Sequence, residues 1–361
     1  MLNICVISNM QQQAEALGTQ FQPIHVLFND RVFTRNLSEM KSYERIIYRT
    51  YSAASKKQEI VEIRRMINQI SPDAIYVNSF PHLLMAGINN KISKSFSKKP
   101  VILATSHTPQ SWESASKRII MAFLLGMFAD GIFTLAQYQE NRLRKMGISP
   151  KRIKTISNAV DVEQFYPNID KVLMNPPDSP ILINVAKISP RKCQETLIRA
   201  IKPIKRDFPR VRLLFTGSQY SDKSYGNFLE NIIIENGVGQ NVNFIGKIEH
   251  NQIPQLLRTA DISLLSSLSE VCPFSVIESL ATGLVTIATS IGGVPDLIDN
   301  NSNGFLVKPK DYSGFADIII KVLRNPALKQ EIEKNARDSA QKYFSYQVIG
   351  QKHKEFLLSI L

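Results

Sequence analysis

The sequence has few of the features that mark a secreted, membrane-spanning or metal-binding protein. Its three cysteines, Cys5, Cys193 and Cys272, lie far apart, with no Cys-x-x-Cys pair and no accompanying histidine cluster. This spacing favours reduced thiols in a cytosolic protein. The longest apolar run, 119–129, is shorter than the roughly 18–20 residues that cross a bilayer. No basic leader or small-residue cleavage site opens the chain, so we expect a cytoplasmic protein.

Repeats, low-complexity tracts and heptads are also absent, and 43% hydrophobic with 21% charged residues is typical of a globular protein. The charge is biased: the net charge is +13, with 21 Lys/Arg against 12 Asp/Glu in residues 1–166 and 23 against 19 in residues 167–361. A basic face attracts nucleic acid, acidic lipid headgroups or diphosphates. Because the cations are dispersed and no recognition motif accompanies them, we expect no nucleic-acid partner.

Short β-rich runs alternate with segments of helical periodicity, such as 56–70 and 113–129, which predicts parallel sheets covered on both faces. The predicted strands are 2–8, 23–28, 74–78, 100–105 and 131–135, then 180–185, 211–216, 242–245, 261–265, 284–288 and 304–307. We therefore predict an α/β protein of two doubly wound, Rossmann-like domains that face each other across a cleft, residues 1–166 and 167–344. A last helix, about 345–361, can pack back on the first domain in this architecture.

One segment of the second half, 261–298, is suited to hold a sugar nucleotide. A strand is followed by a loop with Glu270, and a helix beginning near Phe274 or Ser275 carries Glu278. A helix N-terminus presents unpaired N–H groups that suit a diphosphate. Carboxylates make strong hydrogen bonds to the hydroxyls of sugar and ribose. The alternative is two surface acids near a helix start, where acids are favoured in any protein.

The order of these parts resembles the retaining glycosyltransferases of family 4, which have the GT-B fold. The matching parts are Glu270, Glu278, Ala281-Thr282-Gly283, Gly292-Gly293-Val294-Pro295-Asp296, Val242-Asn243-Phe244-Ile245-Gly246, Asn303-Gly304-Phe305-Leu306-Val307 and Asp311. The resemblance implies that Glu270 binds donor-sugar hydroxyls and that Glu278 binds the ribose. It also implies that backbone amides around Pro273, Phe274 and Ser275 meet the sugar and the diphosphate.

A group of cations follows the strand 180–185, where the sequence reads Asn184-Val185-Ala186-Lys187-Ile188-Ser189-Pro190-Arg191-Lys192. Cations suit this chemistry because they stabilise the growing charge of a nucleoside diphosphate leaving group. The stretch resembles the family's Gly-Arg-x-x-x-x-Lys-Gly site, with Lys192 as the family lysine and Lys187 in place of the arginine. Lysine keeps the charge but not the bidentate fork, so Lys187 and Arg191 both remain candidates for that contact. Gly217 completes the donor-binding residues that we expect.

The first half offers one candidate, His107, directly after the strand 100–105. The family has a histidine at such a strand end beside the reacting sugar, although a lone histidine is otherwise more often structural. The segment 156–167 resembles the family's Pro-Asn-Gly-Val-Asp-x-x-x-Phe-x-Pro and marks the border between the domains. The family's Gly-Gly loop after the first strand is missing, because residues 8–15 are mostly polar and contain no glycine. The acceptor is therefore weakly constrained.

The resemblance implies a glycosyltransferase that moves a sugar, with retention, from a nucleotide-sugar donor to an acceptor hydroxyl. We expect a UDP-sugar ahead of a GDP-sugar, and a glycan or lipid-linked glycan acceptor in cell-surface polysaccharide synthesis. His107, Glu270, Lys192 and Lys187 are the expected catalytic residues. No Asp-x-Asp pair follows an apolar strand, so we expect neither metal nor cofactor, with cations and helix amides in the metal's place. A sugar-nucleotide epimerase of similar fold and a non-catalytic nucleotide-sugar binding protein are the alternatives.

The basic first half also contains aliphatic stretches that suit contact with the inner face of an anionic membrane. One is residues 91–99. The other is the pair Lys117-Arg118, which leads into the apolar run 119–129. The alternative, which we favour from the sequence, is that 119–129 forms an ordinary buried helix.

Overall fold

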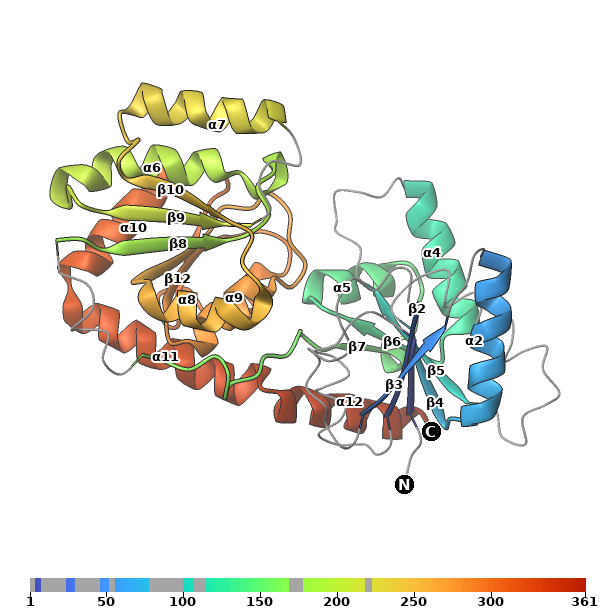
Figure 1. Cartoon of the computed structure of the whole chain (residues 1–361). Helices are drawn as coiled ribbons and strands as arrows, with labels where there is room; N and C mark the ends of the chain where they lie inside the picture. The colour runs from blue at the N-terminus through green and yellow to red at the C-terminus, as the bar shows by residue number, and fades with distance from the viewer. Residues whose placement is uncertain are drawn as a thin grey trace. The chain divides into compact units, whose positions relative to one another are not determined.

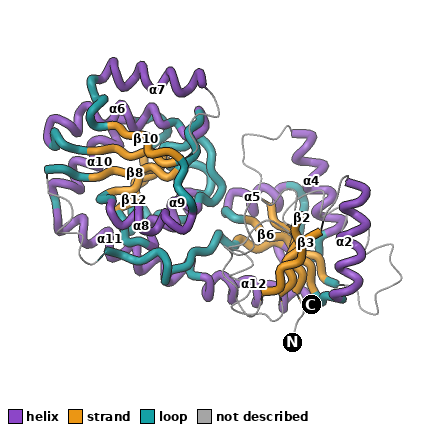
Figure 2. Tube along the Cα trace, in the orientation of Figure 1, coloured by secondary structure: helices purple, strands orange, loops and turns teal. Residues whose placement is uncertain are grey.

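The computed structural model describes residues 4–7, 24–29, 46–51, 56–77, 100–106, 115–168, 178–217 and 223–361 (Figure 1). The chain divides into two compact units, one of Met1–Ala159 with Ser345–Leu361 and one of Val160–Phe344. Each unit has strands at its centre and helices on either side (Figure 2). This is the layered arrangement that alternating strands and helices predict.

The first unit contains a seven-stranded parallel sheet of order β3-β2-β1-β4-β5-β6-β7. Its strands are β1 (Ile4–Ile7), β2 (Ile24–Asn29), β3 (Ile46–Tyr51), β4 (Ala74–Val77), β5 (Val101–Ser106), β6 (Gly131–Thr134) and β7 (Ile153–Thr155). Its described α-helices are α2 (Lys56–Ile70), α4 (Ala115–Phe128), α5 (Gln137–Lys145) and α12 (Tyr346–Ile360). The sheet grows outward from β1 in both directions, which is the doubly wound pattern.

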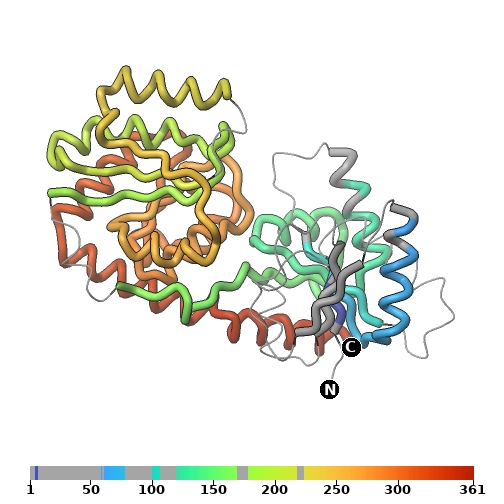
Figure 3. The backbone as a smooth tube through the Cα atoms, viewed as in Figure 1, coloured from blue at the N-terminus to red at the C-terminus, as the bar shows by residue number. Residues whose placement is uncertain are grey.

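Alternate residues of each strand serve two separate cores in this unit, because side chains along a strand point to opposite faces. Ile75 and Val77 of β4 pack in the core that contains α2, α4 and α5. Tyr76, between them, packs in the core that contains Phe356 and Leu357 of α12. The last helix of the chain therefore covers one face of the sheet that the first residues build (Figure 3).

An unusual polar group, His353 of α12, lies inside this second core. Its ring meets Phe133 edge-on at 4.4 Å between centroids, with Tyr76 on a neighbouring side. Among the residues that the structure describes, neither the Nδ1 atom of His353 nor the hydroxyl of Tyr76 has a hydrogen-bond partner. Because burial disfavours the charged imidazolium, it lowers the pKa of His353 to about 3.

His353 is expected to make the protein acid-labile. The unfolded chain binds a proton on this residue below the ordinary pKa of 6.5, whereas the folded chain does not until about pH 3, so acid favours unfolding. The free energy of unfolding should fall by about 1.4 kcal/mol per pH unit in this window from His353 alone. Urea unfolding at pH 7 and pH 5 would measure the loss of unfolding free energy between these two pH values. In His353→Phe this loss should be smaller by about 2 kcal/mol. Equal losses in both proteins would show that His353 titrates normally.

The second unit contains a six-stranded sheet of order β10-β9-β8-β11-β12-β13, again parallel. Its strands are β8 (Ile181–Val185), β9 (Arg212–Thr216), β10 (Val242–Gly246), β11 (Ile262–Leu265), β12 (Val285–Thr289) and β13 (Phe305–Val307). Its α-helices are α6 (Gln194–Asp207), α7 (Lys223–Asn236), α8 (Ile253–Thr259), α9 (Phe274–Ala281), α10 (Tyr312–Arg324) and α11 (Pro326–Phe344). Helices α6, α7 and α10 share one apolar core with the sheet, and α8 and α9 lie on the other side (Figure 1).

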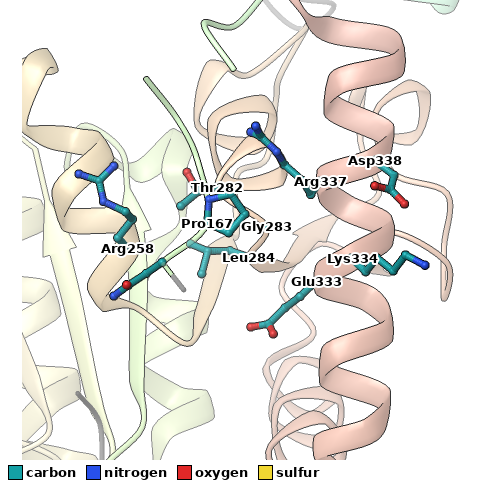
Figure 4. Close-up of a pocket in the computed structure, with 10 residues that line it drawn as sticks. Pro167, Arg258, Thr282, Gly283, Leu284, Glu333, Lys334, Arg337 and Asp338 are labelled. Carbon is teal, nitrogen blue, oxygen red and sulfur yellow. The ribbon is translucent and has the colours of Figure 1, made fainter. Parts of the chain in front are cut away.

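The second unit begins earlier than the predicted border at 166/167, because Arg337 of α11 holds the connecting segment. Its guanidinium donates to the carbonyl oxygens of Val162 at 3.0 Å, Phe165 at 2.7 Å and Ala281 at 2.6 Å. A hollow of about 240 Å³ beside it is lined by Pro167, Arg258, residues 282–284 and α11 (Figure 4). This hollow lies where β12 begins, at the opposite edge of the sheet from the carboxyl ends of the strands.

Candidate functional site

The predicted donor-site residues gather at the carboxyl ends of β8 and β11. These two strands are neighbours, with Ile262 opposite Leu182, yet the chain leaves β8 toward β9 and β10 and leaves β11 toward β12. The connections therefore diverge at this point, and the crevice in which doubly wound folds bind their ligands is expected between the diverging loops. Residues 186–193 follow β8, and residues 266–273 follow β11.

Lys192 and Glu270 form an ion pair across this crevice, between the Nζ and Oε1 atoms. Their side chains are only 13% and 9% exposed. The same carboxylate oxygen accepts a hydrogen bond of 2.7 Å from the hydroxyl of Ser267. Two sequence-predicted residues 78 positions apart are thus brought together, and the charge of each is neutralised by the other.

The two loops are also joined through their backbones, which fixes the position of this pair. Arg191 donates from its guanidinium to the carbonyl of Ser269 at 3.0 Å, and its own carbonyl accepts from the N–H of Leu268 at 2.8 Å. The hydroxyl of Ser266 donates to the carbonyl of Lys192 at 2.9 Å. The side chain of Lys187, by contrast, is exposed and pairs with no other side chain in the described part of the chain, while its carbonyl accepts from the Gln194 amide at 3.1 Å. Arg191 therefore holds the loop, whereas the cation of Lys187 is open to an incoming anion.

Cys193 occupies the place where the family pattern has a glycine, and the backbone there explains the pattern. It is left-handed, with φ 52° and ψ 46°, just before α6 begins. Such a conformation favours glycine over residues with a Cβ. The buried thiol contacts the side chains of Glu195 at 3.2 Å and Thr196 at 3.3 Å. Burial raises the pKa of Cys193 to about 11, so the thiol stays protonated and unreactive.

Two glycines let neighbouring turns approach the site closely. Gly292 has φ +52°, and a Cβ there would lie 1.8 Å from the carbonyl oxygen of Glu270. Gly217, directly after β9, has φ +156°, and a Cβ there would lie 2.2 Å from the carbonyl oxygen of Ala186. Any larger residue would push on the backbone that carries Glu270 or the cation loop.

Helix α9 begins at this edge of the sheet, directly after its N-cap residue Pro273. The N–H groups of Phe274 and Ser275 belong to its first turn, where an α-helix supplies no acceptor of its own. Both residues are partly exposed. A ligand anion in the crevice can therefore accept hydrogen bonds from these amides and experience the favourable end of the helix dipole.

Glu278, further along α9, is buried and has a partner that the sequence did not reveal. Its Oε1 atom lies 2.9 Å from Nε2 of His250, and its side chain is 5% exposed. His250 follows β10 at the carboxyl edge of the sheet, and its ring lies 6.0 Å from that of Phe165. The sequence offered one signal for His250, which is its position shortly after the predicted strand 242–245. Loops that follow parallel strands lie at the same edge of the sheet, so such a histidine is near the site.

The remaining predictions fall partly outside the described residues. His107, the polar stretch 8–15 and the basic stretch 91–99 are not among them. In the ranges that the structure covers, no three His, Cys, Asp or Glu side chains are grouped to hold a metal ion, and metal independence stays a prediction. No described helix is both long and apolar enough to cross a membrane.

Comparison with known proteins agrees with this geometry over both units. Residues 31–164 match the family model described as Glycosyltransferase Family 4, and residues 166–339 match that described as Glycosyl transferases group 1. The two models together extend over most of the chain. The protein belongs to the group 1 glycosyltransferases, and the predicted family is confirmed.

Individual relatives are distant. A D-inositol 3-phosphate glycosyltransferase of Saccharomonospora viridis is 25% identical over 255 residues, which is 68% of this chain but only 58% of that protein. A GDP-mannose-dependent monoacylated α-(1-6)-phosphatidylinositol monomannoside mannosyltransferase of Corynebacterium glutamicum is 22% identical over 352 residues, 90% of this chain and 88% of that one. HepE of Anabaena, solved with UDP, superposes with a TM-score of 0.82 at 18% identity, covering 99% of this chain and 100% of HepE. The predicted GT-B fold is thereby confirmed.

Proposed function

We propose that this enzyme transfers a sugar, with retention of anomeric configuration, from a UDP-sugar bound at the carboxyl ends of β8 and β11. The observation that carries the proposal is the buried Lys192–Glu270 pair beside the free N-terminus of α9. It combines a cation, an acceptor for hydroxyl groups and a set of unpaired amides in one crevice, which are the groups that a sugar diphosphate requires.

Each group then has a role on the donor. Glu278 binds the ribose hydroxyls through Oε2, since Oε1 is occupied by His250. The amides of Phe274 and Ser275 bind the diphosphate, together with Lys192 and the exposed Lys187. Glu270 exchanges part of its contact with Lys192 for the sugar hydroxyls, so the lysine becomes available to the phosphate as the donor binds.

The transfer itself breaks the bond between the anomeric carbon and the phosphate oxygen and forms a bond from that carbon to the acceptor oxygen. The acceptor's proton passes to the leaving phosphate on the same face of the sugar, which preserves the configuration. Lys187 and Lys192 stabilise the negative charge that develops on the diphosphate. No metal is needed for this role, so the rate should be unchanged after treatment with EDTA. His107 remains the proposed neighbour of the anomeric centre.

The donor and acceptor are inferred from chemistry and from relatives. HepE was solved with UDP and with UDP-glucose, whereas the Corynebacterium relative is named as GDP-mannose-dependent. We propose a UDP-sugar because the superposition with HepE covers both chains fully. The Corynebacterium relative is named for a glycolipid acceptor, which supports a glycan or lipid-linked glycan as the acceptor here, in the synthesis of cell-surface polysaccharide.

A thermal-shift screen of UDP-, GDP- and ADP-sugars tests the donor assignment. We expect the melting temperature to rise most with a UDP-sugar and the rise to disappear in Glu278→Ala. If no nucleotide sugar stabilises the wild-type protein, the assignment of these residues to a donor site is wrong. Turnover of the nucleotide sugar without any acceptor would favour an epimerase instead. NMR of the product's anomeric proton tests retention, and an inverted product would contradict it.

His250 is expected to set the affinity for the donor by holding Glu278. In His250→Ala, the Oε1 atom of Glu278 loses its hydrogen bond, which is worth about 1.5–3 kcal/mol when one partner is charged. The Kd and the KM for the donor should therefore rise about tenfold, with a smaller change in kcat. His250→Gln retains a donor and should restore part of the affinity. An unchanged Kd in His250→Ala would show that Glu278 is positioned without the histidine.

A further inference from the structure

Helix α4 leaves a row of large apolar side chains in water. Ile119, Ile120, Phe123 and Met127 are 63%, 56%, 63% and 40% exposed, although they belong to the longest apolar run of the sequence. The opposite stripe of the helix, including Ala122 and Leu125, packs in the core. The expectation of an ordinary buried helix is therefore wrong at these four positions. A contiguous apolar row of this kind marks an interaction surface.

The row borders an open groove of about 680 Å³ between α4 and the turn that follows α5. Phe123, Gly126 and Met127 line one wall, and Met146, Gly147 and Arg152 line the other. A Cβ at either glycine would meet no atom within 4 Å, so the groove is open at both positions. It lies where β6 and β7 begin, which is the opposite edge of the sheet from the strand ends that face substrates in such folds.

Positive charge surrounds the far wall of this groove. Residues 141–160 contain six Lys or Arg and no Asp or Glu. Lys145, Lys151 and Lys154 are exposed, whereas Arg152 is held by the carbonyls at the end of α4, including that of Gly126 at 3.0 Å. An apolar groove therefore lies beside several cations. Among the acidic residues, Asp130 is the nearest in sequence to the residues that line this groove.

We propose that this surface, defined by Ile119, Ile120, Phe123, Met127, Lys145 and Lys151, docks the enzyme on a membrane of anionic phospholipids. The apolar row enters the boundary between headgroups and acyl chains, and the lysines bind the headgroup phosphates. A second copy of the chain fits less well, because residues 1–166 carry 21 Lys/Arg against 12 Asp/Glu and two such surfaces repel. Nucleic acid would use the cations but leave the apolar row in water.

Vesicle co-sedimentation of the full chain tests the proposal, with vesicles of phosphatidylcholine alone and of phosphatidylcholine with an equal part of phosphatidylglycerol. We expect binding only to the anionic vesicles, and weaker binding at higher salt. Replacing Ile120 and Phe123 by serine should reduce the binding at least tenfold, since both side chains are already exposed and contribute through the lipid. Lys145→Gln and Lys151→Gln should each reduce it about fivefold at low salt. The matched control is Ile234→Ser, at a position on α7 where the isoleucine is 77% exposed.

Two results would overturn this inference. One is a failure of the vesicle test, seen either as no binding to anionic vesicles or as binding that Phe123→Ser and Ile234→Ser reduce equally. The other is a dimer, seen by analytical ultracentrifugation, that dissociates in the Ile120 and Phe123 variants, which would show that a second copy covers the surface. The thermal shift with UDP-sugar, read on the same samples, separates this test from that of the proposed function, because docking and donor binding use different residues.

Discussion

Glu270→Gln is expected to lower kcat/KM by about 10²–10³-fold, which would be the largest catalytic effect of any conservative substitution in the donor site. Glutamine keeps the shape and the hydrogen bond from Ser267, but it removes the charge that Lys192 faces in a nearly buried position. The bonds to the sugar hydroxyls lose their charge assistance, and Lys192 is left without a counter-charge. Steady-state kinetics with the preferred donor would measure the change.

The partner substitution and a control define what this result means. Lys192→Met should also lower kcat/KM strongly, and the double variant should lose less than the two single effects combined, because the residues act as one pair. Asp207→Asn removes the exposed pair between Arg324 and Asp207 in the same unit and should change neither rate nor stability measurably. Activity of Glu270→Gln within threefold of wild type would remove Glu270 from the catalytic site.

Gly292→Ala is expected to disrupt the site through the backbone alone. The new Cβ would lie 1.8 Å from the carbonyl oxygen of Glu270, and neither of these atoms belongs to a flexible side chain that can move aside. The turn or the Glu270 loop must therefore shift. We expect the donor's Kd to rise at least tenfold and the free energy of unfolding to fall by about 1–3 kcal/mol beyond the cost of the left-handed backbone.

Gly237→Ala is the matched control for this prediction. Gly237 has φ +63°, close to the +52° of Gly292, but its Cβ would meet no atom within 4 Å. It should therefore cost only the left-handed strain, about 1–2 kcal/mol, and leave donor binding intact. Urea unfolding and calorimetry with the donor would measure both variants. Equal effects of the two substitutions on the Kd would show that the contact between Gly292 and Glu270 does not matter.

Much of the fold could be predicted because it depends on local patterns. Every predicted strand is present within a residue or two of its expected bounds, since buried parallel strands read as short apolar runs. Two edge strands were missed for related reasons. β3, at one edge, contains Arg49 in its middle, and β7, at the other, has only three residues. Neither presents the run of apolar residues by which a central strand is recognised.

The site could be predicted only as far as its motifs reach. The pattern located Glu270, Lys192 and the N-terminus of α9, but not the pair that Lys192 and Glu270 form, since that contact depends on the order of strands in the sheet. It also missed His250, because a histidine in a loop carries no local signal of its partner 28 residues away. The exposure of one face of α4 was hidden for a different reason: both faces of this helix are apolar, so periodicity could not separate the buried stripe from the exposed one.

A crystal structure of the protein with the UDP-sugar that gives the largest thermal shift tests the central claim most directly. We predict that the ribose hydroxyls lie within hydrogen-bond distance of Glu278 and that the diphosphate lies on the amides of Phe274 and Ser275 with Lys192. The sugar should lie against Glu270. Nucleotide bound elsewhere, for example in the hollow beside Arg337 (Figure 4), with the Lys192–Glu270 crevice empty, would contradict the assignment.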